Sequence, residues 1–205
     1  MDAIRDDFAF AAMYRAYALT DGSIHNNLEE QFKFRKQTIL ADESLTNDEK
    51  SKVIKWLNEE FDFDKLLYNK GAKRICENCQ EECLATTYCE HCVRNYLKAN
   101  FPKWTSGNND VDNLIQKCQS ETIAPNKIVE WIPYNNLQNI KYLTRGGYSE
   151  IYTADWINGR YDEWDSKEKQ LKRQSGSGVK YKVVLKKLEN VENASRNWLE
   201  EVISS

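Results

Sequence analysis

Two closely spaced cysteine pairs constrain the fold of this chain more than any other feature. They lie in the stretch CENCQEECLATTYCEHC, and their members are Cys76, Cys79, Cys89 and Cys92. Each CxxC turn presents two thiolates from one tight loop, and two such turns complete a tetrahedral site for Zn²⁺. The interval between the pairs is shorter than the roughly 15–20 residues of a zinc ribbon but long enough for a compact hairpin. We therefore expect a small zinc module.

The expected role of this zinc ion is structural. Four cysteine ligands leave no open coordination position for a water molecule, so the pattern favours folding over catalysis. Cys83 and His91 are spare residues that can replace one member of the set. A redox pair or buried free thiols are the alternatives to zinc. Cys118 is far from the cluster in sequence, and we expect it to be a small core residue.

The charge and hydropathy of the chain exclude several classes of partner. The net charge of -3 gives no electrostatic case for binding nucleic acid or a membrane surface. No apolar run approaches the about 18 residues of a membrane span, and charged residues interrupt the N-terminus too often for a signal peptide. We expect an intracellular, cytoplasmic protein with protein partners. In that reducing environment the thiols are free to bind metal.

The residues before the cysteines predict a helical leader over 1–70. Apolar residues recur at helical spacing, among them Phe8 and Ala12, without an intervening proline. The sequence TNDE is typical of a capping box, with Thr46 as the N-cap and Glu49 three residues later. A helical packing module is the main interpretation, and a partner-binding helix surface is the alternative.

After the cysteine-rich module, placed at 71–105, the pattern changes twice. A connector over 106–133 contains the expected short helix VDNLIQKCQSE, with Asp110 as its cap. From residue 134 onward, short strand-like runs follow: NIKYL, EIYTADW and KYKVVLKKL. The polar segment between the last two is expected to be a solvated hairpin, or a docking surface for an acidic partner. The predicted fold class is α+β: a helical segment, a zinc-knuckle-like module and an antiparallel sheet.

The stretch LTRGGYSEIYTADW has the form of a phosphate-covering loop between two strands. Glycine lets backbone N–H groups approach phosphates, and Ile151 can form an apolar ceiling above an adenine ring. Further on, VVLK ends a predicted strand with Lys186. Fifteen residues later Glu201 lies in NWLEEVISS, which is expected to begin a helix. The order of glycine loop, strand lysine and helix glutamate is that of a protein-kinase ATP site.

On these motifs the chain resembles the tyrosine-kinase-like protein kinases expanded in arbuscular mycorrhizal fungi. The upstream ICENCQEECLATTYCEHCVRNYLKANFPKWTSGN is similar to the zinc-knuckle-like leader of that group, so the resemblance covers most of 71–205. It implies a kinase N-lobe at 134–205 and transfer of phosphate from ATP, with Mg²⁺, to Ser/Thr or Tyr. The family's three glycine-loop positions correspond to Thr144, Gly146 and Ser149. The residues that the resemblance assigns to the nucleotide site are Leu143, Gly146, Gly147, Tyr148, Ser149, Ile151, Ala154, Lys186 and Glu201.

The sequence lacks the later kinase motifs. It contains no HRD-type catalytic loop and no DFG aspartate for Mg²⁺. We therefore expect this chain alone to be inactive, as a kinase truncated within its first lobe or as a short kinase-related protein. The alternative is a non-catalytic interaction or decoy protein that uses the zinc module and the kinase-like lobe.

Overall fold

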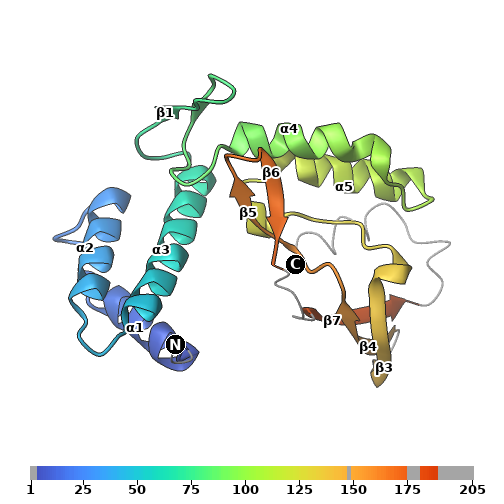
Figure 1. The fold of residues 1–205 in the computed structure, drawn as a ribbon, viewed down its shortest axis with the longest axis horizontal. Helices are drawn as coiled ribbons and strands as arrows, with labels where there is room; N and C mark the ends of the chain where they lie inside the picture. Colours follow the sequence, from blue (N-terminus) through green and yellow to red (C-terminus); the bar gives the residue numbers. More distant parts are fainter. Residues whose placement is uncertain (1–3, 147–148, 175–180, 189–205) are drawn as a thin grey trace. The chain divides into compact units, whose positions relative to one another are not determined.

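The computed structural model describes residues 4–146, 149–174 and 181–188. Within these ranges the fold is mixed α+β, with five α-helices and three small antiparallel sheets (Figure 1). The chain divides into two compact units, residues 1–91 and 92–205. None of the helices in the described ranges is both long enough and apolar enough to cross a membrane.

Three helices form the first part of unit 1, which confirms the predicted helical leader. The third begins with the predicted capping box: the Thr46 side chain accepts from the Glu49 backbone N–H, and the Glu49 side chain accepts from the Thr46 N–H. This exchange satisfies two backbone donors that the first helical turn leaves without partners. The bounds of the three helices are α1 (Asp6–Ala18), α2 (Leu28–Ala41) and α3 (Asn47–Leu67).

Small side chains on α1 form its contact with the core of unit 1. Ala9, Ala12 and Ala16 are buried, and they belong to one apolar cluster with residues of α2 and α3. Because alanine has only a Cβ, the helix backbones can approach closely along this face. Phe8 belongs to the predicted apolar pattern but is 50% exposed. Phe10 stacks on Trp56 with ring centroids 4.5 Å apart.

Two two-residue strands and a helix follow α3. The strands β1 (Arg74–Ile75) and β2 (Glu82–Cys83) pair in antiparallel register, Arg74 opposite Cys83 and Ile75 opposite Glu82. The helix α4 (Glu90–Asn100) begins directly after Cys89, and the division between the two units falls within its first turn.

Unit 2 contains most of α4 together with α5 (Asn109–Glu121). Arg94 Nε donates to the Thr122 carbonyl oxygen at 2.8 Å. The predicted cap of α5 at Asp110 is wrong by two residues. Asn108 is the N-cap, and its side-chain oxygen accepts from the backbone N–H of Asp110. Both residue types cap helices well, so spacing alone did not separate them.

The predicted strands form a three-stranded antiparallel sheet in the order β3-β4-β7. Between β4 and β7 the chain forms the predicted hairpin, but one side of it is packed rather than solvated. Leu171 is 6% exposed, and the rings of Trp164 and Tyr96 pack in a T-shaped arrangement with centroids 5.8 Å apart. The strand bounds are β3 (Leu137–Gly146), β4 (Ser149–Trp156), β5 (Tyr161–Asp165), β6 (Gln170–Arg173) and β7 (Tyr181–Leu188).

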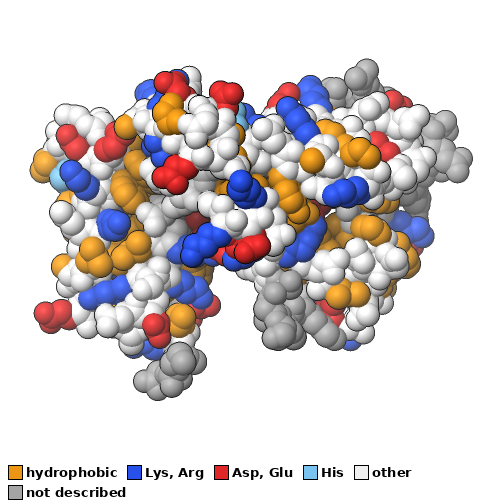
Figure 2. Space-filling model, turned by 45° about the horizontal axis from the view of Figure 1, so that its top comes forward, with side chains coloured by type: hydrophobic (Ala, Val, Ile, Leu, Met, Phe, Trp, Pro, Cys, Tyr) orange, Lys and Arg blue, Asp and Glu red, His pale blue; other side chains and the backbone are white. Residues whose placement is uncertain are grey.

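Short 3-10 turns connect several of the helices and strands. The turns are η1 (Phe101–Lys103), η2 (Pro125–Lys127) and η3 (Tyr134–Asn136). On the face seen in Figure 2, basic and acidic side chains are interspersed.

Candidate functional site

The first CxxC pair lies in the turn of the β1–β2 hairpin. The Cys76 backbone N–H donates to the Glu81 carbonyl oxygen, and the Gln80 N–H donates to the Cys76 carbonyl oxygen, both at 2.9 Å. Gln80 has a φ of 62°, in the left-handed region that non-glycine residues adopt mainly in tight turns. This turn brings Cys79 back beside Cys76, as a metal-binding knuckle requires.

The second CxxC pair lies at the start of α4. Cys89 immediately precedes the helix, and Cys92 follows within its first turn. The unpaired N–H groups and the dipole of a helix N-terminus favour thiolates over thiols. His91, between the two cysteines, turns its Nε2 toward the Glu82 carbonyl oxygen at 3.0 Å.

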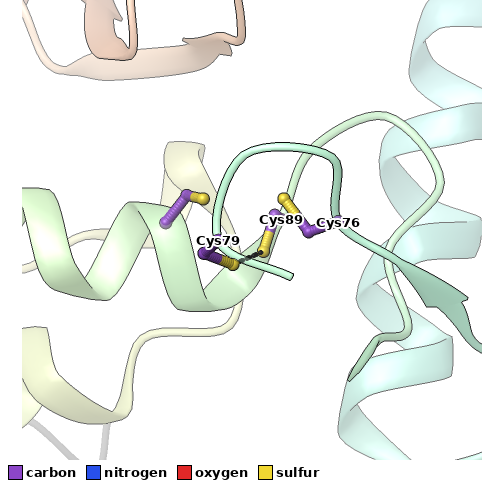
Figure 3. A group of neighbouring side chains, drawn as sticks. Cys76, Cys79 and Cys89 are labelled. Atoms are coloured by element: carbon purple, nitrogen blue, oxygen red, sulfur yellow. Dashed lines mark hydrogen bonds between the residues drawn. The ribbon is translucent and has the colours of Figure 1, made fainter. Parts of the chain in front are cut away.

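The two pairs meet in one cluster. The four Sγ atoms of the paired cysteines all lie within 4.8 Å of one another, and the Cys79 and Cys89 sulfurs are 3.6 Å apart (Figure 3). A tetrahedral Zn²⁺ with Zn–S bonds of about 2.3 Å separates its sulfur ligands by about 3.8 Å. None of these four cysteines is disulfide-bonded, and three of the four residues are buried. The cluster therefore has the composition and size of a four-thiolate metal site.

The surroundings of Cys76 favour the ligating form of its thiol. Burial acts to raise the pKa of this thiol, but backbone hydrogen bonds from Cys79 and Asn78 and side-chain hydrogen bonds from neighbouring cysteines outweigh it. The result is a pKa lowered from 9.0 to about 6. A thiolate is thus accessible at neutral pH before any metal binds.

The two cysteines outside the CxxC pairs, Cys83 and Cys118, lie in different surroundings. Cys83 is buried, burial raises the pKa of its thiol, and it forms a second group with Cys89 and Glu90 whose ligand atoms also lie within 4.8 Å of one another. Cys118 is half-buried and belongs to neither group of potential metal ligands found among the described residues. The sequence did not single out Glu90, because an acidic side chain at the start of a helix is usually exposed to solvent and interacts with the helix dipole.

A buried aspartate of α3 holds the loop that joins the two knuckles. Asp62 is fully buried, and its carboxylate accepts four hydrogen bonds, from the backbone N–H and the hydroxyl of both Thr86 and Thr87, at 2.6–2.8 Å. From the other side, Arg74 Nε donates to the Ala85 carbonyl oxygen at 2.8 Å. Both contacts fix the backbone between the cysteine pairs. Sequence reasoning missed Asp62, since its partners are more than twenty positions away.

The sheet of unit 2 brings together some of the predicted nucleotide-site residues. In the β4–β7 register, Ile151 lies opposite Lys186 and Thr153 lies opposite Val184. Because side chains alternate along a strand, these four residues share one face of the sheet. Lys186 is exposed, and Val184, which the sequence did not single out, is 68% exposed. This face carries an apolar side chain and a cation toward solvent.

The other predicted nucleotide-site residues are distributed differently. Ala154 is one position out of phase with Ile151, so it lies on the opposite face, where it is 3% exposed. Ser149 is buried and pairs with Gly146 at the end of the β3–β4 hairpin. Leu143 is 58% exposed, next to a register shift in β3. Three predicted residues lie outside the described ranges: Gly147, Tyr148 and Glu201.

Comparison of the chain with protein-family models, with curated proteins and with solved structures found no match.

Proposed function

We propose that the four paired cysteines bind one Zn²⁺ ion and that this ion stabilises the fold of the surrounding module. The observation that carries the proposal is the convergence of four Sγ atoms within 4.8 Å of one another. Thiolate sulfur is a soft ligand, and a site of four such ligands with tetrahedral dimensions selects zinc or iron–sulfur chemistry among the transition metals. The knuckle arrangement, one CxxC in a hairpin turn and one at a helix start, suits a single ion.

The β1–β2 hairpin has few backbone ladder bonds of its own. The β1–β2 ladder consists of two residues in each strand, whereas an isolated hairpin is marginal in water even at greater length. Zinc binding to four thiolates contributes directly to folding in modules of this size. The ion therefore acts as a cross-link between the hairpin and the start of α4, and it holds no substrate.

The test is native mass spectrometry of the reduced full chain, purified without chelator. We expect one zinc ion per chain. In Cys79→Ser we expect the zinc to be lost, whereas Cys118→Ser serves as the matched control and should retain it. A metal-free wild-type chain, or visible absorption from an iron–sulfur cluster, would refute the proposal.

We also propose that the open face of the β3-β4-β7 sheet binds an adenine nucleotide, as the first lobe of a kinase-related protein. The supporting observation is the shared face of Ile151, Val184 and Lys186, which offers apolar contact to a base and a cation to a phosphate. Strand order and direction agree with the expected sequence of glycine loop, second strand and lysine-bearing strand. The kinase family that the chain resembles uses such a nucleotide site to phosphorylate proteins.

This second proposal is tested by thermal-shift titration with ATP and Mg²⁺. We expect a concentration-dependent rise of the unfolding temperature that is lost in Lys186→Ala. The matched control is Lys187→Ala, because Lys187 lies on the opposite face of the same strand, where it pairs with Glu150 at 3.1 Å. A missing shift in the wild-type chain would instead favour a non-catalytic interaction protein.

A further inference from the structure

The side of α1 opposite its buried alanines is largely apolar and exposed. A helix on the surface of a protein usually carries polar side chains on its outer face. On α1, however, Phe8 is 50% exposed and Tyr14 is 71% exposed. The small side chains of Ala11 and Ala18 are exposed on the same side of the helix. Exposed apolar residues that lie next to one another mark an interaction surface.

Charged side chains of opposite sign lie at the two ends of this face. Asp7 is in the first turn of α1 and Arg15 is in the last turn. Asp7 is exposed and has no ion-pair partner within the described part of the chain. Arg15 donates to Asp42 Oδ2 at 2.7 Å, but its side chain is still 54% exposed. A guanidinium has five N–H donors, so this single bond leaves Arg15 able to pair with a second carboxylate.

A second copy of the same face complements this arrangement. Consider two α1 helices packed antiparallel, related by a two-fold axis that passes between them at the level of Ala11. Each residue then lies level with the residue an equal number of positions beyond Ala11 in the other copy. Asp7 is level with Arg15 of the second copy, and Phe8 is level with its Tyr14. Ala11 meets Ala11, where small side chains let the two backbones approach closely.

The charges favour this antiparallel orientation over a parallel one. A parallel pair of α1 helices would place Asp7 level with Asp7 and Arg15 level with Arg15, so like charges would repel at both ends. In the antiparallel pair, opposite charges meet at both ends. The aromatic rings of Phe8 and Tyr14 also meet twice, and such ring pairs contribute beyond the area that they bury.

We propose that α1 is a self-association surface through which two copies of the chain form an antiparallel dimer. The helix has 13 residues and is therefore about 20 Å long, so one helix from each copy makes a small interface. Interfaces of this size are weak and transient. The dimer is accordingly expected to form and dissociate with protein concentration over the micromolar range.

The test is analytical ultracentrifugation of the full chain, with its thiols kept reduced so that no intermolecular disulfide forms. We expect the average mass to rise from one chain to two as the protein concentration increases. In Ala11→Glu two carboxylates face each other at the two-fold axis, so the dissociation constant should rise by more than about tenfold. Gln37→Glu adds the same charge at an exposed position of α2. It is the matched control and should dimerise as the wild type does.

Charge reversal tests the antiparallel pairing. In Asp7→Arg, arginines face each other at both ends of the interface, and in Arg15→Asp, aspartates do. Each variant alone should therefore be monomeric at concentrations where the wild type is dimeric. In an equimolar mixture, every arginine of one variant faces an aspartate of the other, so mixed dimers should form.

Circular dichroism checks that each variant is folded. Should Arg15→Asp unfold because it loses the hydrogen bond to Asp42, the comparison of Ala11→Glu with Gln37→Glu decides. The proposal is overturned if the wild type stays monomeric, if its mass exceeds two chains, or if Ala11→Glu dimerises as tightly as Gln37→Glu. A mixture of the two folded charge variants that stays monomeric overturns the antiparallel pairing.

Discussion

Substitution of Asp62 by asparagine tests how α3 positions the zinc module. Asp62 is fully buried, and its two carboxylate oxygens accept the backbone N–H and hydroxyl groups of Thr86 and Thr87. Asparagine has nearly the same shape, so Asp62→Asn opens no cavity. It keeps one acceptor oxygen and turns an N–H₂ group toward the other threonine, where two donors then face each other.

The expected loss of stability follows from these four hydrogen bonds. The two hydrogen bonds that the remaining oxygen accepts are no longer made to a charged group, and one threonine backbone N–H loses its acceptor. Together these changes cost about 2–4 kcal/mol. The threonine side chains are exposed, so water can hydrate their hydroxyls, and we attribute the loss mainly to the backbone donor. For a unit of about 90 residues, this corresponds to a fall of roughly 10–25 °C in the unfolding temperature.

The assay is urea and thermal unfolding followed by circular dichroism, with Asp64→Asn as the matched control. Burial raises the pKa of Asp64, and so does the neighbouring Glu60 carboxylate, so the fold disfavours the charged form of Asp64. Its neutral analogue should unfold within about 0.5 kcal/mol of the wild type. Equal midpoints for the two variants would show that the Asp62 hydrogen bonds do not hold the loop.

Four further perturbations are expected to change stability in specified directions. Hydrogen bonds from Arg5 hold the pKa of Glu49 well below its ordinary 4.5. The stability that this carboxylate contributes is therefore present above pH 4.5 and is lost as the pH falls below 4.5. The fall in unfolding temperature between pH 7 and pH 3 should be smaller in Glu49→Gln than in the wild type. Thr46→Ala removes the N-cap of α3 and should cost about 1 kcal/mol in urea unfolding. Ala12→Leu overpacks a side chain that is 1% exposed and should cost about 1–3 kcal/mol in the same assay, whereas a neutral result would mean that the α1 interface has room. Chelation of zinc should lower the unfolding temperature of the wild type but leave that of Cys79→Ser unchanged, as seen by differential scanning fluorimetry.

Local rules account for what the sequence predicted correctly. The capping box of α3, the two CxxC turns and the three strands of the sheet each depend on residues within a few positions of one another. Their patterns can therefore be recognised in the sequence. The sequence did not indicate that Asn108 rather than Asp110 caps α5, because both residue types are good N-caps. On α1, helical spacing predicted an apolar face but not that Ala9 and Ala16 would be buried while Phe8 stayed half exposed. Which of these side chains is buried depends on how closely α2 and α3 approach α1.

Buried polar groups mark where the sequence alone was least informative. Asp62 and Glu49 are both buried, and the carboxylate of each accepts hydrogen bonds from donors within the fold. In the described part of the chain, two buried side-chain oxygens lack a partner: Gln119 Oε1 and Glu90 Oε2. Glu90 lies in the group that shares Cys89 with the four paired cysteines. Because Zn²⁺ with four thiolate ligands carries a net negative charge, the Glu90 carboxylate lies beside an anionic centre, and its own charge opposes metal binding there. A Glu90→Gln variant should therefore hold zinc at least as tightly as the wild type and lose at least as much unfolding temperature on chelation. A smaller loss than in the wild type would contradict this assignment.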